Sequence, residues 1–164
     1  MTVRPVDDDQ WEVVAWLWQA YRHDLSEVVH GFPYADGRYQ HAGLDGYPRP
    51  DAVGYLDWRP HPNTGEDAPV AFAVVGGLDA ARRTVDAFFV VPAARRGGTG
   101  RALAADVIAR HPGAWEIAFQ DGNVSAGHFW RAVARDAWGD AWTETEEPVP
   151  GKPDLPPDHW IRTI

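Results

Sequence analysis

Cysteine is absent from this 164-residue sequence, and lysine occurs once, at Lys152. The lack of cysteine excludes disulfide bonds, thiolate nucleophiles, iron–sulfur clusters and cysteine-ligated zinc, although it leaves the redox compartment open. Fifteen basic residues face 24 acidic ones, which gives a net charge of −9. That sign is wrong for a protein that coats phosphate backbones, so we expect no nucleic-acid partner.

Long apolar runs are also missing, so we expect no membrane span. The amino terminus, MTVRPVDDDQ, has no basic region followed by an apolar run, which predicts a cytoplasmic protein without a secretory signal. The single lysine among fourteen arginines indicates a GC-rich bacterial genome. With 45% hydrophobic and 24% charged residues, the composition is that of a globular protein, and the length predicts one domain over residues 1–164.

The order of predicted elements indicates a mixed α/β fold. Residues 2–6 alternate as a strand does, and apolar residues then recur at helical spacing from about residue 8 to residue 21. Residues 31–65 are rich in glycine, proline and aromatic residues without a sustained period, which predicts connections around short elements. The remaining segments predict strands at 69–77, 82–91, 115–120, 142–147 and 159–164, and helices at 101–110 and after Asn123.

A glycine-rich loop, Arg95-Arg96-Gly97-Gly98-Thr99-Gly100, stands between a predicted strand and a predicted helix. Free backbone N–H groups and the positive end of a helix dipole favour phosphate oxygens at such a position. The spacing fits neither of two nucleotide motifs, because Leu103 stands where the dinucleotide motif has its last glycine and no Lys-Ser/Thr pair follows the loop.

The loop resembles the R/Q-x-x-G-x-G/A signature of the GNAT superfamily of N-acetyltransferases, with Arg95, Gly98 and Gly100 at the fixed positions. A second family signature, N-x-x-A-x-x-[apolar]-[aromatic], matches Asn123, Ala126 and the pair Phe129-Trp130. The resemblance covers residues 69–135. It implies one domain with a central, mostly antiparallel sheet that splays around the cofactor and is flanked by helices.

The resemblance further implies that acetyl-CoA is the co-substrate. The amides of the glycine loop would hold its pyrophosphate, Phe89, Val90 and Val91 would pair with the pantetheine arm as an added strand, and Asn123 would contact the pantetheine. A β-bulge near Val90 is typical of the family. The expected cofactor-binding residues are therefore Phe89, Val90, Val91, Arg95, Arg96, Gly97, Gly98, Thr99, Gly100, Arg101, Asn123, Phe129 and Trp130.

Direct acetyl transfer needs a neutral amine, and alkylamines with a pKa of ~10 are protonated at pH 7, so a base must remove a proton. Asp86 is our first candidate for that base, with a solvated or ion-paired aspartate as the alternative. The family commonly protonates the leaving thiolate with a tyrosine, but Trp130 stands at the matching position, and an indole N–H is not a usable acid. Ser125, His128 or water would then supply the proton.

Other clusters favour structural roles. The seven histidines include no metal-ligand spacing, so we expect no metal, and most of the nine tryptophans are expected in the core. The acidic group Glu144, Glu146 and Glu147 is interpreted as a solvated face, with steering of a cationic substrate as the alternative.

The sequence thus predicts an acetyl-CoA-dependent N-acetyltransferase for a small amine that the net charge slightly favours as cationic. Acceptor contacts are expected between Tyr21 and Trp58, from Asp24, Glu27, Tyr34, Tyr39 and Tyr47. One alternative is a non-catalytic acyl-CoA-binding or sensing protein of the same fold; another is a partner-binding domain whose glycine loop is only a turn. The acceptor's identity and the oligomeric state are left open, a homodimer being one option.

Overall fold

The computed structural model describes residues 2–149, 151–152 and 154–164. Seven strands form one sheet in the order β1-β2-β3-β4-β5-β7-β6, in which only β4 and β5 run parallel. The predicted mixed α/β fold with a mostly antiparallel sheet is confirmed. The strands are β1 (Thr2–Pro5), β2 (Val53–Pro60), β3 (Asp67–Gly76), β4 (Arg82–Val90), β5 (Ala114–Gln120), β6 (Trp142–Glu147) and β7 (Asp158–Thr163).

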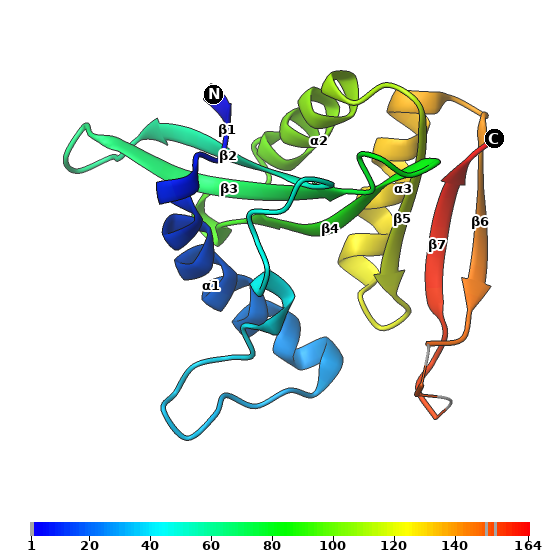
Figure 1. Ribbon diagram of the computed structural model, residues 1–164, viewed down its shortest axis with the longest axis horizontal. Coiled ribbons are helices and arrows are strands. Elements are labelled where there is room, and N and C mark those ends of the chain that lie inside the picture. The colour runs from blue at the N-terminus through cyan, green and yellow to red at the C-terminus, as the bar shows by residue number, and fades with distance from the viewer. Residues whose placement is uncertain (1, 150, 153) are drawn as a thin grey trace.

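Three helices cover the sheet: α1 (Trp11–Val29), α2 (Thr99–Arg110) and α3 (Val124–Trp138). Figure 1 shows α1 on one face of β1–β4 and α2 on the other, with α3 beside β5 and with β5, β7 and β6 turned away from the first four strands. On the α1 face, Val14 and Trp18 pack with Phe72 and Phe89. The other face buries Leu103 and Val107 of α2, and α3 packs on β5 and β7.

Helix α1 ends eight residues later than the sequence predicted. Leu25 is buried and Val28 approaches Gly122, so the apolar face continues beyond Tyr21 although the residues between are mostly polar. The helix ends at His30, which adopts the left-handed conformation with φ 50°.

Strand β2 was not predicted, because the segment shows no period of two. Gly54, Tyr55, Leu56 and Asp57 are all buried, since β2 lies inside the sheet with both faces covered. Burial of Asp57 is compensated by the Arg59 guanidinium at 3.2 Å and by the Thr2 N–H at 3.2 Å.

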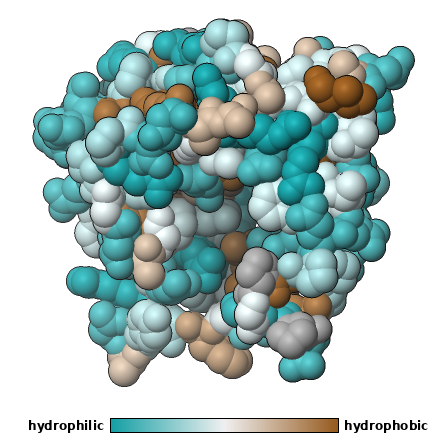
Figure 2. Space-filling view, turned by 45° about the vertical axis from the view of Figure 1, so that its right-hand side comes forward, coloured by the Kyte–Doolittle hydropathy of each residue, from teal (hydrophilic) through white to brown (hydrophobic). Residues whose placement is uncertain are grey.

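Among the described residues, no helix is both long and apolar enough to cross a bilayer. Figure 2 shows a mostly hydrophilic surface in which hydrophobic side chains are scattered rather than gathered into one large patch on the face in view.

Candidate functional site

The two parallel strands at the centre of the sheet pair over only three residues. Arg82, Arg83 and Thr84 of β4 lie opposite Ala114, Trp115 and Glu116 of β5. Beyond Thr84 the strands separate, and β5 continues beside β7 as far as Gln120 (Figure 1). The second half of β4 therefore has an unpaired backbone edge, which lies toward β5.

A β-bulge occurs where the two strands separate. Val74 of β3 lies opposite Ala87 and Val75 lies opposite Val85, so Asp86 is the extra residue. The expectation of a bulge near Val90 is wrong: it lies four residues earlier, where a carboxylate side chain rather than an apolar one occupies the extra position.

Only part of the predicted pantetheine strand has a free edge. The Val91 N–H donates to the Val70 carbonyl at 2.9 Å, so by the alternation of antiparallel pairs Phe89 also directs its backbone groups toward β3. The backbone of Val90 points to the open side, where its carbonyl accepts from Arg95 Nε at 2.8 Å. Val90 is thus the one of the three predicted residues whose backbone an added strand can reach.

The glycine loop follows β4 and leads into α2. Arg96 (φ 64°) and Gly98 (φ 82°) are left-handed, and Gly98 is the N-cap of α2. The buried Thr99 hydroxyl donates to the Ala94 carbonyl at 2.7 Å and holds the loop against the helix. A Cβ at Gly97 or Gly98 would meet nothing within 4 Å, so the loop faces open space. The first-turn amides of α2 lack partners in their own helix and can bind an anion.

The side chains of this loop extend in two directions. Arg95 turns back toward α1, where it pairs with Asp24 and lies 5.5 Å above the Phe89 ring. Arg101 pairs with Asp136 of α3. Since both guanidiniums have carboxylate partners, the backbone amides and the exposed Arg96 are the anion-binding groups of the loop that face solvent.

Helix α3 borders the wedge, as we call the region beyond Thr84 where β4 and β5 separate. Phe129 lies 3.1 Å from the position of a Cβ at Gly100, and its ring centroid lies 5.3 Å from that of Phe88. Trp130 is 6% exposed and packs on Phe88 in the core, so its indole is part of the support of β4. Phe129 therefore lies at the wedge and Trp130 lies behind it in the core, although the sequence predicted that both bind the cofactor.

Asn123 caps α3, as the sequence predicted. Its side-chain oxygen accepts from the Ala126 N–H at 3.1 Å and from the Ser125 hydroxyl at 3.2 Å, which leaves its amide N–H groups for a ligand. Ser125 and His128 are exposed on α3.

Asp86 does not have a free carboxylate. It accepts from the Tyr47 hydroxyl at 2.7 Å, from Arg49 at 3.1 Å and from the Thr84 hydroxyl at 2.6 Å. A Cβ at Gly76 would lie 2.4 Å from one of its oxygens, so the carboxylate fits over β3 only because residue 76 is glycine. Its side chain is 28% exposed.

The loop that carries Tyr47 and Arg49 joins α1 to β2. The Tyr47 ring stacks on Trp11 at 4.9 Å, and burial, followed by the bond to Asp86, raises the pKa of its hydroxyl. Arg49 also pairs with Asp51 at 2.9 Å. The sequence pointed to Tyr47 only as one of several acceptor contacts and did not indicate Arg49, because nothing in the local pattern shows that this loop returns to β4.

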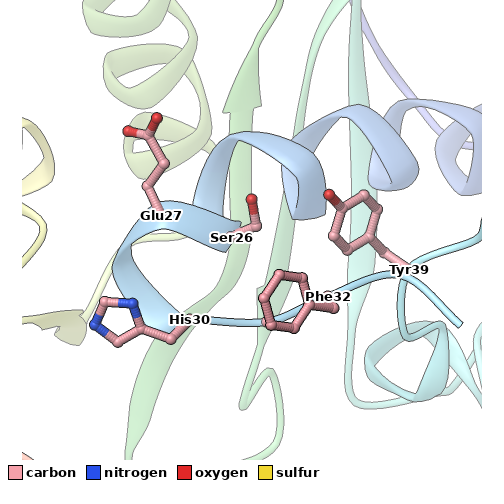
Figure 3. A pocket seen from close by; sticks show the side chains of 6 residues that line it. Ser26, Glu27, His30, Phe32 and Tyr39 are labelled. Atoms are coloured by element: carbon pink, nitrogen blue, oxygen red, sulfur yellow. The ribbon is translucent and has the colours of Figure 1, made fainter.

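The other predicted acceptor residues are dispersed. A hollow of about 350 Å³ lies between the end of α1 and the following loop, lined by Ser26, Glu27, His30, Gly31, Phe32 and Tyr39 (Figure 3). Glu27 and Tyr39 belong to this hollow, whereas Tyr34 is 63% exposed and Asp24 pairs with Arg95. The predicted acceptor residues thus do not form one site: Tyr47 lies at Asp86, Glu27 and Tyr39 line the hollow, and Asp24 and Tyr34 belong to neither place.

The acidic group at β6 is largely paired. Glu144 bonds Arg131 and His159, and Glu147 pairs with Arg162. In the described ranges, no group of three acidic or histidine side chains has the geometry to hold a metal ion.

No protein-family model matches the sequence, and no curated protein is similar to it in sequence. Solved structures are similar in fold. A structure from Bacteroides thetaiotaomicron, assigned as a GNAT-family acetyltransferase, is 13% identical with a TM-score of 0.55, covering 99% of this chain and 86% of its own. The chain has the GNAT fold.

Two further solved structures are similar to this chain in fold. A variant of spermidine N-acetyltransferase from Vibrio cholerae is 9% identical with a TM-score of 0.60, covering 100% of this chain and 95% of its own. A protein from Bacillus anthracis assigned as a streptothricin acetyltransferase, solved in complex with acetyl coenzyme A, is 13% identical with a TM-score of 0.53, covering 76% of this chain and 69% of its own.

Proposed function

We propose that this protein is an N-acetyltransferase that moves an acetyl group from acetyl-CoA to a small amine. The observation that carries the proposal is the wedge between β4 and β5, which opens directly beside the glycine loop at the start of α2. Both the fold and the acetyl-CoA complex of one similar structure support it.

The residues present fit acetyl-CoA. The open space at Gly97 and Gly98, together with the first-turn amides of α2, suits a pyrophosphate. The N–H of Val90, whose carbonyl is bonded to Arg95, lies on the open side of β4 and suits an extended amide-bearing arm. Phe129 borders the arm, and the amide of Asn123 offers a hydrogen bond to it. Acetyl-CoA, when bound, supplies the activated acetyl carbon.

Asp86 is the proposed proton acceptor. It lies at the bulge where the wedge begins, and three hydrogen-bond donors hold its carboxylate in position. An acceptor ammonium would transfer a proton to Asp86, directly or through a water, and the neutral nitrogen would then attack the acetyl carbon. The bond between the acetyl carbon and sulfur would then break, and the released thiolate would receive the second nitrogen proton by relay through water, Ser125 or His128.

We test this role with Asp86→Asn, which preserves the shape and removes the base. The expected result is a fall in kcat of about 10²- to 10⁴-fold, measured as thiol release from acetyl-CoA with spermidine and agmatine as trial amines. An unchanged rate would show that another group accepts the proton.

One observation favours a second candidate, a non-catalytic acyl-CoA-binding protein. Trp130 is buried at the position where the family commonly has a tyrosine acid, and Arg49 occupies Asp86. Saturable acetyl-CoA binding without thiol release across a broad amine panel would support this candidate.

A further inference from the structure

We propose that the Arg49 guanidinium occupies the site at Asp86 where the cationic nitrogen of the acceptor binds. A cationic amine must therefore displace the Arg49 side chain before it can react. The inference deepens the proposed function, on which it rests for the identity of the acceptor. It names the substrate class, an alkylammonium or guanidinium compound, and gives Arg49 the role of a specificity-determining residue.

Arg49 lies among groups that bind cations. Its guanidinium lies between Asp86 at 3.1 Å and Asp51 at 2.9 Å, and 4.8 Å above the ring of Tyr47. Two carboxylates and an aromatic face can bind a planar guanidinium and also an alkylammonium. The contacts that hold Arg49 are therefore contacts that an external cation could make.

The position of the Asp86 carboxylate is fixed by residues of the sheet as well as by the loop. The Asp86 carboxylate is fixed by Thr84 on its own strand and by the space above Gly76 on β3. If Arg49 left, Asp86 would stay in place beside the wedge with one negative charge uncompensated. The Asp86 carboxylate can thus bind the cation of a ligand in the same position in which it binds Arg49.

The ion pairs of Arg49 are weak enough for a ligand to displace its side chain. Its side chain and that of Asp51 are each 39% exposed, so the ion pairs are near the surface and individually weak. A long side chain can swing into water and keep its charge solvated. Displacement is therefore within reach of a ligand, whereas Tyr47, stacked on Trp11, would keep the loop attached to the molecule.

The test measures binding of agmatine and spermidine by isothermal titration calorimetry, with N-butylacetamide as a neutral probe. Arg49→Gln removes the internal competitor, so the Kd of both amines is expected to fall by about two- to tenfold, with little binding of the neutral probe. Asp86→Asn is expected to abolish amine binding. Arg4→Gln, which breaks a comparable exposed pair with Asp67, is the matched control and is expected to leave the Kd unchanged.

A second measurement uses the unaltered protein. Saturating agmatine is expected to speed amide hydrogen exchange at Arg49 and Asp51, because the Arg49 side chain loses its bonds to Asp86 and Asp51 while Tyr47 keeps its stacking on Trp11. Unchanged exchange there would overturn the proposal, even if Arg49→Gln failed to fold. Weaker amine binding by a folded Arg49→Gln variant, or no amine binding by any variant, would overturn it as well.

Acetyl-CoA binding is measured in parallel and separates this inference from the proposed function. If amines bind as expected and acetyl-CoA does not, the acetyltransferase proposal fails while the role of Arg49 stands as cation recognition. If acetyl-CoA binds and the amine results are negative, the role of Arg49 fails alone.

Discussion

His159 lies between two carboxylates that come from different elements. Its Nδ1 is 2.8 Å from Glu144 of β6 and its Nε2 is 3.0 Å from Asp121, which follows β5. The bond to Asp121, followed by that to Glu144, raises the pKa of the imidazole, and the bond to Arg131 lowers the pKa of Glu144. The charged form of His159 therefore ties the end of β5 to the last two strands.

Stability should consequently fall as His159 loses its proton. Because the folded pKa is raised above the unfolded value of ~6.5, the contribution is complete below that value and is lost as the pH rises through the folded pKa. The Tm of the wild type should exceed the Tm of His159→Gln by about 2–8 °C near pH 5.5, and the difference in Tm should be smaller at pH 9. A difference that is constant with pH would assign the effect to packing on Phe119, whose ring stacks on the imidazole at 5.1 Å.

Gly76 is required by its neighbour rather than by its own backbone. A methyl group there would lie 2.4 Å from one oxygen of Asp86, a carboxylate that three donors hold in place. Gly76→Ala should lower stability by about 1–3 kcal/mol, measured by denaturant unfolding. The same substitution in an Asp86→Ala background should cost less, because only the Thr84 hydroxyl oxygen at 2.7 Å then remains close to the added methyl group, and equal effects in both backgrounds would contradict this explanation.

Among the elements, the glycine loop is where a substitution can weaken acetyl-CoA binding without lowering the stability of the fold. Gly97 has open space at its Cβ position and no left-handed φ, so Gly97→Leu should leave the Tm nearly unchanged. Its side chain would extend into the region where an anion approaches the α2 amides, and the acetyl-CoA Kd should rise by at least tenfold. Gly31→Leu, outside the loop, is the control; equal Kd values for both variants would show that phosphate does not bind here.

Elements with a clear local period could be predicted from the sequence, including the order strand, glycine loop, helix, strand and helix from residue 69 onward. Strand β2 could not, because a central strand buried on both faces does not alternate. The pairing of Arg49 with Asp86 was equally inaccessible, because it joins residues 37 positions apart through a loop without a period. Likewise, the bulge depends on the register between β3 and β4, which a single sequence does not state.

At the scale of the whole molecule, the sheet consists of two parts that meet at three residue pairs of β4 and β5. The first part carries Asp86 and the glycine loop, and the second carries the start of α3. Helix α1 reaches both, since Asp24 pairs with Arg95 and Val28 approaches Gly122. We expect Asp24→Asn to weaken acetyl-CoA binding about two- to fivefold by freeing the loop, with a smaller effect at high salt.

Isothermal titration of the protein with acetyl-CoA tests the central claim most directly, because it needs no knowledge of the acceptor. Desulfo-CoA and ATP serve as controls for the thiol end and for the nucleotide. We expect saturable 1:1 binding of acetyl-CoA, retained binding of desulfo-CoA and no comparable binding of ATP. Absence of acetyl-CoA binding by the folded protein would contradict the proposed acetyltransferase function and leave only the fold.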